Sequence, residues 1–432
     1  MNLLKFLNVF FLPIFVDYLK LYETLHIDKD FIHKMIMKQR RNWAAMKIKK
    51  KTQIIISCSD YENNYDQIAA IGKLKYKLPM IDSYVLEVDE ESLQYLQNEP
   101  ELWSYEFDTH ITAQMNRVSE IIDLKWAHDR NIYGENIGVA IVDTGICLHK
   151  DFTDGTNRIR GFYDLIHGRT EPYDDNGHGS HVAGIIGGNG CLSNGKYIGV
   201  APKCNLISIK VLDQKGDGNI SDVLAGLQWL IDNKEKYNIR IVNISVGTTT
   251  KENVDENSLL VKGVNAVWDA GIIVVVAAGN NGPGPMSIST PGISRKVITV
   301  GSSDDRISVE LFGNKTTDYS GRGPTASCIR KPDIVAPGSN IISCGTMKNY
   351  QRYRYNLINN PRSDNFKIMY TVKSGTSMAT PIVSGAIALL LSKYPRMNNR
   401  DVKLKLRESA VNLGHPWSKQ GWGLLNIPRL LS

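Results

Sequence analysis

The chain has 432 residues, more than one hydrophobic core usually serves, and its 42% hydrophobic and 22% charged residues lie in the ordinary globular range. We therefore expect two domains or more, and the net charge of +7 does not call for a nucleic-acid partner. The six cysteines form no C-x-x-C pair, which excludes a zinc ribbon and a thioredoxin-type motif. An even number permits disulfides, but six cysteines in a chain of this length do not make a disulfide scaffold, so we expect free thiols in a reducing compartment.

Residues 1–46 form an N-terminal extension. An apolar run at 6–16 is interrupted by Pro13 and lacks a small-residue cleavage site, so we expect a docking or amphipathic segment, with a secretory leader as the alternative. The run is too short for a transmembrane helix. Basic residues crowd into 29–51, where we expect a solvated helix face rather than a contact with nucleic acid or lipid.

Residues 47–112 combine short strand and helix patterns. Strands are predicted at 52–58 and 83–89, one helix begins near Tyr65, and another is closed by Pro100. Strands and helices in that order indicate a small α+β domain.

From residue 117 to 432, after a linker expected at 108–120, strand patterns alternate with helix patterns. The strand patterns are NIGVAIVD, CNLISIKVLD, IRIVNIS and IIVVVAA. The alternation predicts an α/β fold with a doubly wound, mostly parallel sheet and helices on both faces. Ligand sites in such sheets lie beyond the carboxyl ends of the strands, where Asp143, the run 245–247 and Asn280 fall.

Four polar side chains of this region are candidates for chemistry, although each also has an ordinary structural explanation. Asp143 follows an apolar strand, and His178 stands between two glycines. The spacing of His178 and His181 does not match a helical zinc site, which needs an i,i+4 pair and an intervening glutamate. Asn280 ends a buried strand, and Ser377 lies at the start of an apolar helix, where a serine is often only a cap.

Taken together, these residues stand in the motifs VDTGI, HGSHVAG, AAGN and SGTSMATP, in that order. Over residues 117–432 the chain resembles the subtilisin-like serine proteases (subtilases, peptidase family S8), and the segments between the motifs are most similar to the AprX type. The resemblance implies a serine endopeptidase that acts on protein or peptide substrates and requires no cofactor for its chemistry.

The resemblance makes Ser377 the nucleophile and His178 the general base, with Asp143 orienting the imidazole. Asn280 would donate to the oxyanion, together with the backbone N–H of Ser377 at a helix N-terminus. We expect Pro381 in the first turn of that helix, where no helical N–H bond is lost.

Two other interpretations of the same residues are an α/β-hydrolase and a subtilase without catalytic activity. An α/β-hydrolase is excluded because GTSMA lacks the second glycine of G-x-S-x-G and because the order of the triad differs. A catalytically silent subtilase, acting as a binding or signalling module, is the alternative. It is disfavoured because all four catalytic positions are intact.

For substrate binding, the resemblance offers two segments as edge strands that pair with an extended peptide. They are Gly216, Asp217 and Gly218, and Ser245, Val246 and Gly247. Their small or apolar neighbours predict a pocket for a large apolar side chain. Asp217 would favour a basic residue nearby in the substrate.

Asp151 matches a calcium-ligand position of some subtilases. The loop GGNGCLSNGKY lacks the pattern that would complete such a site, so no metal ligand is assigned and a structural calcium ion stays open. The basic segment 346–367 is an insertion before the nucleophile, expected to form a flap or processing loop.

Residues 47–112 resemble the propeptide of subtilases, which assists folding and inhibits the enzyme, so we expect a zymogen inhibited by its own prodomain. Parallel sheets fold slowly because their contacts are non-local, which gives a physical reason for such help. An accessory domain that is never removed is the alternative. AprX-type enzymes are associated with the cell interior, so a cytoplasmic location is expected, with secretion as the alternative; the oligomeric state is not predicted.

Overall fold

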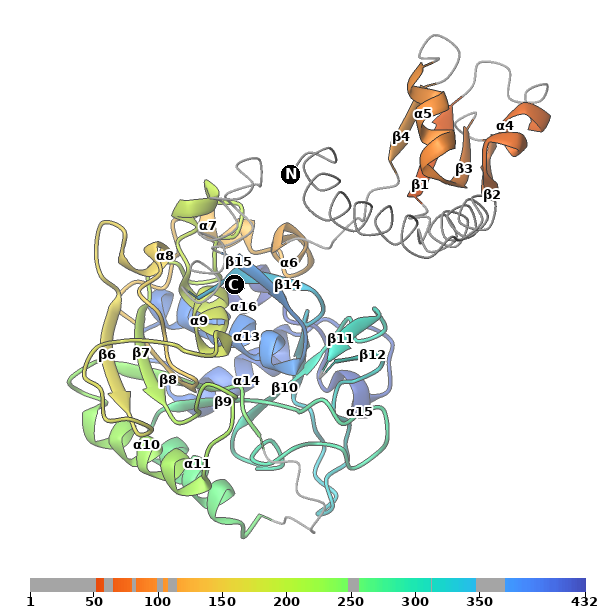
Figure 1. Cartoon of the computed structure of the whole chain (residues 1–432). Helices are drawn as coiled ribbons and strands as arrows, with labels where there is room; N and C mark the ends of the chain where they lie inside the picture. The colour runs from red at the N-terminus through yellow and green to blue at the C-terminus, as the bar shows by residue number, and fades with distance from the viewer. Residues whose placement is uncertain are drawn as a thin grey trace, which may run out of the picture. The chain divides into compact units, whose positions relative to one another are not determined.

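The computed structural model describes residues 52–57, 65–79, 83–98, 104–107, 115–247, 256–311, 313–346 and 370–432. The predictions for the N-terminal extension, and for the insertion beyond Thr346, lie outside these residues. The chain divides into two compact units, Met1–Ile111 and Thr112–Ser432, and each is described by itself. Figure 1 shows the elements of both units.

The first unit is a small antiparallel sheet with two helices. Its elements are β1 (Thr52–Ser57), α4 (Tyr65–Ile71), β2 (Lys73–Leu78), β3 (Ser83–Val88), α5 (Glu90–Asn98) and β4 (Ser104–Phe107). The strand order is β2-β3-β1-β4, and the core includes Ile54, Ile56 and Leu86 from the sheet with Ile68 and Leu96 from the helices. Strand β2 is not predicted by the sequence patterns, because its alternating lysines belong to an exposed edge strand.

The second unit contains a seven-stranded sheet, and its elements are best given together. They are α6 (Met115–Ile121), α7 (Lys125–His128), β5 (Gly138–Asp143), α8 (Lys150–Thr153), β6 (Ile159–Asp164), α9 (His178–Gly187), η2 (Cys191–Ser193), β7 (Asn205–Lys210), α10 (Ile220–Asn233), β8 (Ile239–Ile244), α11 (Leu259–Asp269), β9 (Ile273–Ala277), β10 (Ile298–Ser302), β11 (Val309–Leu311), β12 (Asn314–Thr316), β13 (Ile334–Ala336), β14 (Ile341–Cys344), β15 (Tyr370–Lys373), α13 (Thr376–Lys393), α14 (Asn399–Ser409), α15 (Trp417–Gln420) and α16 (Ile427–Leu431).

The main sheet has the order β13-β10-β9-β8-β5-β7-β6, and all of its neighbouring strands are parallel. Helices α9 and α13 pack on one face, and α10 and α11 on the other (Figure 1). The predicted doubly wound α/β sheet is confirmed. Reversals of strand order in such sheets place loops from several strands at one carboxyl edge, where a site can form.

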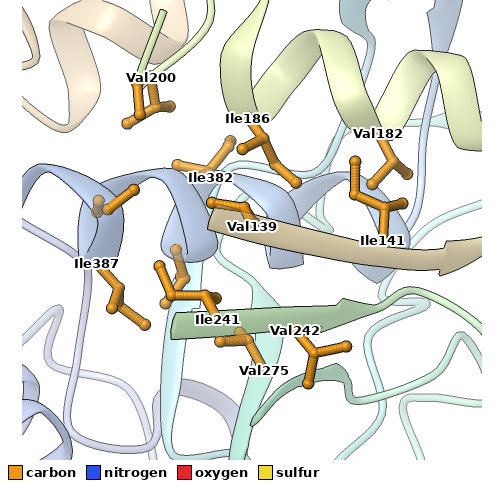
Figure 2. Packing of buried hydrophobic residues seen from close by; sticks show 14 of the residues in the cluster. Val139, Ile141, Val182, Ile186, Val200, Ile241, Val242, Val275, Ile382 and Ile387 are labelled. Atoms are coloured by element: carbon orange, nitrogen blue, oxygen red, sulfur yellow. The ribbon is translucent and has the colours of Figure 1, made fainter. Parts of the chain in front are cut away.

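The core between the sheet and helices α9 and α13 is almost purely aliphatic. Figure 2 shows Val139 and Ile141 of β5 beside Val182 and Ile186 of α9, with Ile382 of α13 next to them. All five side chains are buried. Because α9 and α13 share this core with the central strands, the residues at the starts of both helices are held rigidly relative to the sheet.

The linker predicted at 108–120 is partly wrong. Helix α6 begins at Met115, and Val118 and Ile122 are buried in the core of the second unit. Their i,i+4 spacing puts both side chains on one face of a helix, which is the signal that the linker interpretation overlooked.

Helix α13 is, among the described residues, the one helix long and apolar enough to cross a membrane by length and composition alone. Since 83% of it is buried inside the fold, its composition is that of a core helix. The prediction that Pro381 lies in the first turn is wrong, because the helix starts at Thr376. The Ser377 carbonyl, which residue 381 would have bonded in a regular helix, accepts the Ser245 hydroxyl at 3.1 Å instead.

Candidate active site

The predicted general base, His178, is in direct contact with Asp143, the residue expected to orient it. Asp143 ends strand β5 and is completely buried, while the His178 side chain at the start of α9 is 25% exposed. His178 Nδ1 lies 2.7 Å from Asp143 Oδ1 and 2.9 Å from Oδ2. Because a carboxylate only accepts, the proton of the neutral ring is on Nδ1, and Nε2 carries the lone pair that a general base needs.

A second buried aspartate, Asp174, holds the start of the helix that carries His178. Its carboxylate accepts the amides of Gly177 at 2.8 Å and Ser180 at 2.9 Å, and also the Thr144 hydroxyl at 3.0 Å. These bonds satisfy amides that have no partner inside the helix and connect them to the residue after strand β5. The sequence analysis missed Asp174, although an aspartate shortly before a helix start is a usual capping signal.

A buried lysine supports the same strand end. Lys210 Nζ donates to the carbonyls of Thr144 at 2.6 Å and Leu212 at 2.8 Å, and to the Asp175 carboxylate at 2.8 Å. Three ammonium hydrogens therefore meet three acceptors, which is what a fully buried charge requires. A lysine inside the apolar strand LISIKVL is the sequence signal for such a site.

Ser377 is the second residue of helix α13 and is half-buried. Its Oγ donates to the Ser245 carbonyl at 2.9 Å. Ser245 follows β8, which is the neighbour of β5, so the nucleophile candidate lies at the same edge of the sheet as Asp143. Within the described residues, the structure brings Asp143 and His178 together but gives no hydrogen bond between His178 and Ser377. A rotation of the Ser377 side chain would be needed to make one.

Asn280 contacts the turn before Ser377. Its Oδ1 accepts the Thr376 amide at 2.9 Å and the Thr376 hydroxyl at 3.0 Å. Since an N–H can only donate, these bonds fix which amide atom is oxygen and leave Nδ2 as the donor on the other side. Gly375 has a φ of +132°, and a Cβ there would lie 3.0 Å from Asn280 Nδ2, so this close approach requires glycine.

The other hydroxyls of the segment have structural partners. Ser374 Oγ accepts the Asn340 amide at 2.9 Å, and Thr376 Oγ1 accepts the Gly279 amide at 3.1 Å. Thr380 Oγ1 donates to the Thr376 carbonyl at 2.8 Å. These three hydroxyls hold the turn, so they do not compete for the role of nucleophile.

Residues 134–423 match the Subtilase family (Peptidase_S8), a range that includes all four candidate catalytic positions. The chain is a subtilase. Serine protease AprX of Bacillus subtilis (strain 168) is 34% identical to it over 411 residues, which cover 91% of this chain and 89% of that protein. The thermostable alkaline protease of Halalkalibacterium halodurans is 32% identical over 397 residues, with 90% and 94% covered. The resemblance predicted from the motifs is confirmed, and the chain belongs to the subtilisin-like serine proteases.

Solved structures agree with this assignment. A cold adapted subtilisin-like serine proteinase superposes with a TM-score of 0.51 at 27% identity, covering 68% of this chain and 90% of the other. The CspB protease of Clostridium perfringens superposes with a TM-score of 0.58 over 73% of this chain and 98% of the other. At 22% identity, the second comparison supports the fold alone.

The two segments expected to bind substrate in this subtilase are loops. Neither 216–218 nor 245–247 is a strand, so the prediction of edge strands is wrong for the chain alone. A segment counts as a strand only when it is hydrogen-bonded to a neighbouring strand. The neighbour expected for these two segments is the substrate peptide, which the chain alone does not supply. Asp213 closes the first loop, because its amide donates to the Asp217 carbonyl at 2.8 Å and its Oδ1 accepts the Asp217 amide at 3.0 Å. A Cβ at Gly218 would lie 2.2 Å from a backbone carbonyl, so glycine is required there.

Asp151, the calcium-ligand candidate, is fully buried and has other partners. Its Oδ2 accepts the Tyr370 hydroxyl at 2.8 Å and the Cys344 thiol at 3.7 Å. Its Oδ1 accepts the Cys191 thiol at 3.4 Å and the Leu192 amide at 3.3 Å. Calcium takes six to eight oxygen ligands, whereas two thiols stand here. The residues present do not fit calcium, so we propose no calcium ion at Asp151.

Burial shifts the pKa of the two thiols beside Asp151 and of a histidine in the first turn of α9. It raises the pKa of Cys191 to about 11, helped by the charge of Asp151, and it raises the pKa of Cys344 well above its usual range. Burial also lowers the pKa of His181 to about 3. His181 Nε2 donates to the carbonyls of Ile341 and Thr371, both at 3.1 Å, so this neutral ring joins strands β14 and β15.

Proposed function

We propose that this subtilase is an endopeptidase that hydrolyses peptide bonds through an acyl-enzyme on Ser377. The observation that carries the proposal is the Asp143–His178 pair, with Nδ1 bonded to both carboxylate oxygens, at the sheet edge where Ser377 starts helix α13. A serine hydroxyl ionises too weakly near neutral pH to attack a carbonyl unaided, and an imidazole with a free Nε2 is the base that it needs.

The first half of the reaction follows from this geometry. Ser377 Oγ turns from the Ser245 carbonyl and attacks the scissile carbonyl carbon, while His178 Nε2 takes its proton. Asp143 stabilises the imidazolium that forms. The carbonyl oxygen becomes an oxyanion that accepts from Asn280 Nδ2 and from the Ser377 amide. That amide is free for this task because the first amides of a helix have no partner within it.

The second half regenerates the enzyme. The imidazolium gives its proton to the leaving amine, the C–N bond breaks, and the acyl group stays on Ser377. Water then attacks the acyl carbon with His178 again acting as the base, which releases the acid and restores the hydroxyl.

We propose that an extended peptide lies between the loops 216–218 and 245–247. Gly216 has a φ of +89°, and the backbone at Gly218 has no room for a Cβ, so both positions keep polar backbone atoms unobstructed by side chains. Asp217 is exposed and carries a negative charge beside this path. A basic residue in the substrate near Asp217 should therefore be favoured over an acidic one.

We propose that residues 47–112 act as an inhibitory prodomain that is cut off by the enzyme itself. The first unit supports this as a compact sheet-and-helix body with its own core, ahead of the catalytic unit in sequence. The parallel sheet of the second unit joins strands distant in sequence, which is the topology that gains most from assisted folding.

The test compares the full chain with two serine variants. Wild type should shorten by about the first unit on intact-mass measurement, whereas Ser377→Ala should stay full length. Ser392→Ala, at the far end of the same helix, is the matched control and should shorten like wild type. A wild-type chain that never shortens but cleaves a peptide substrate would contradict the proposed zymogen, while the proposed protease activity would stand. A chain that neither shortens nor cleaves peptide after limited proteolysis would indicate the silent subtilase.

We propose that the enzyme works inside the cell. The five cysteines among the described residues are all free thiols, as suits a reducing compartment. Fractionation of producing cells should find the activity in the cytosol, whereas recovery in the medium would support secretion.

A further inference from the structure

A group of metal-binding side chains lies at the C-terminal end of helix α9, away from His178. A ring nitrogen of His149, a carboxylate oxygen of Asp151 and the Cys344 thiol all lie within 4.8 Å of one another. The three residues are 3%, 0% and 1% exposed. Cys191, which is half-buried, completes the group with its Sγ 3.4 Å from Asp151 Oδ1. We call these four residues the thiol cluster.

The thiol cluster gathers residues from separate parts of the chain. His149 and Asp151 belong to the start of α8, Cys191 begins η2, and Cys344 ends β14. They form neither a C-x-x-C motif nor a pair of histidines at helical spacing, so no sequence pattern indicates that they meet.

The spacing of the thiol cluster suits a tetrahedral zinc ion. Zinc bonds of about 2.0 Å to nitrogen or oxygen and about 2.3 Å to sulfur place tetrahedral ligands about 3.3–3.8 Å apart. His149 Nδ1 accepts the Asp151 amide at 3.1 Å, a bond that it would exchange for the metal, and it lies 3.7 Å from Asp151 Oδ1. Cys344 Sγ lies 3.7 Å from Asp151 Oδ2. Cys191 Sγ lies 3.4 Å from Oδ1, so two pairs of ligand atoms that include Oδ1 already have the separation that zinc requires, and Cys344 lies beside the other oxygen of the same carboxylate.

The charges around the thiol cluster also balance with zinc. Arg158 is buried, and its Nη2 donates to the Asp151 carbonyl. Without metal, the guanidinium offsets the Asp151 carboxylate while the thiols of Cys191 and Cys344 are neutral. When zinc binds, the two thiols release two protons to solvent and form two Zn–S bonds, with no change of oxidation state. Two positive charges of zinc and one of Arg158 then offset two thiolates and one carboxylate, so both states are neutral.

We propose that the thiol cluster is a structural zinc site. Zinc there would join α8, η2 and β14, and β14 pairs with β15, the strand that leads into the helix of Ser377. The same ion would therefore brace the loop that follows Asp143 and the strand that precedes the nucleophile. Its ligands are all on this chain and contain no group assigned to the reaction.

Cobalt is the probe for this site because its thiolate complexes absorb in the near ultraviolet, whereas its carboxylate and imidazole complexes do not. The full chain carrying Ser377→Ala, which cannot digest itself, is stripped with a chelator, reduced without added thiol, and titrated with Co²⁺. One equivalent should bind with the thiolate absorption, and Zn²⁺ should displace it. Cys344→Ser and Cys191→Ser should each remove about half of that absorption and weaken binding at least about 10–100-fold.

Two variants serve as matched controls for loss of a thiol. Cys328→Ser removes an exposed thiol, and Cys204→Ser removes a buried thiol outside the cluster; both should titrate like the parent. Thermal unfolding shows whether each variant is folded. If Cys344→Ser does not fold, the proposal is judged on Cys191→Ser, because the Cys191 side chain is only half-buried. The proposal is overturned if the parent shows no thiolate absorption, or if Cys191→Ser keeps the full absorption and affinity.

Discussion

Helix α9 has a fully buried aspartate near each end, and the two aspartates have different partners. At the start of the helix, Asp143 bonds the imidazole of His178. At its end, Asp151 accepts the thiols of Cys191 and Cys344. Burial is the same for both carboxylates, so burial does not assign their roles. The partners do: an imidazole with a free nitrogen can move protons, whereas the thiols beside Asp151 are soft ligands that suit the zinc ion proposed above.

The largest effect should come from Asp143→Asn, which keeps the shape of the side chain. The amide would donate to Nδ1 and favour the tautomer that leaves no lone pair on Nε2. We expect kcat on a peptide substrate to fall about 10⁴-fold, the magnitude known for this change in a trypsin triad, with little change in Tm. Steady-state kinetics after prodomain removal measures it. A fall of less than about tenfold would mean that Asp143 does not orient the base.

Asn280→Ala should have the next largest effect. It removes the Nδ2 donor of the oxyanion and should lower kcat about 10²–10³-fold with KM nearly unchanged, a magnitude taken from the corresponding donor of subtilisin itself. Asn281→Ala is the matched control, because Asn281 Nδ2 donates to Ser289 at 3.2 Å instead. Equal kcat for the two variants would contradict the oxyanion role.

Asp151→Asn should affect stability and not catalysis, which would sharpen the contrast between the two aspartates. The amide keeps one acceptor oxygen and loses the charged acceptor for Tyr370 and the thiols, at a cost of about 1–3 kcal/mol in the free energy of unfolding. Urea titration measures that loss, and kcat should stay near wild type. A fall in kcat as deep as that of Asp143→Asn would erase the distinction.

His181→Gln should have the smallest effect near neutral pH, because the change that it makes in stability depends on acid. The folded state keeps His181 neutral down to a pKa of about 3, whereas the unfolded chain protonates it near 6.5. Between these values the unfolded state binds more protons, so His181 lowers the free energy of unfolding as pH falls, by up to about 1.4 kcal/mol per pH unit. Glutamine removes this term, so the variant should take up about one proton fewer on unfolding near pH 5. If the Tm of His181→Gln depended on pH as the wild-type Tm does, His181 would not be kept neutral by the fold.

The sequence predicted the central sheet because strand patterns are local. Val139 and Ile141 belong to an apolar strand that alternates with helix patterns, and the end of that strand placed Asp143 at the carboxyl edge of the sheet. The helix that starts at His178 also follows from a local pattern, whereas Ser374 and Thr376 bond the distant residues Asn340 and Gly279.

What the sequence did not give depends on contacts between distant segments. Asp174 is recognised as a cap only when its carboxylate meets the turn of the next helix. Asp151 has the position of a calcium ligand, yet Cys344, far along the chain, decides that calcium does not fit. Pro381 is tolerated because Ser245 supplies the missing donor, which no local pattern predicts.

The most direct test of the central claim is to locate the nucleophile chemically. After removal of the first unit, the enzyme is treated with a fluorophosphonate and the modified peptide is identified by mass spectrometry. The account predicts one label per chain, on Ser377, and loss of that label in Ser377→Ala and Asp143→Asn but not in Asp151→Asn. A label on another serine, or equal labelling of Ser377→Ala and wild type, would contradict it.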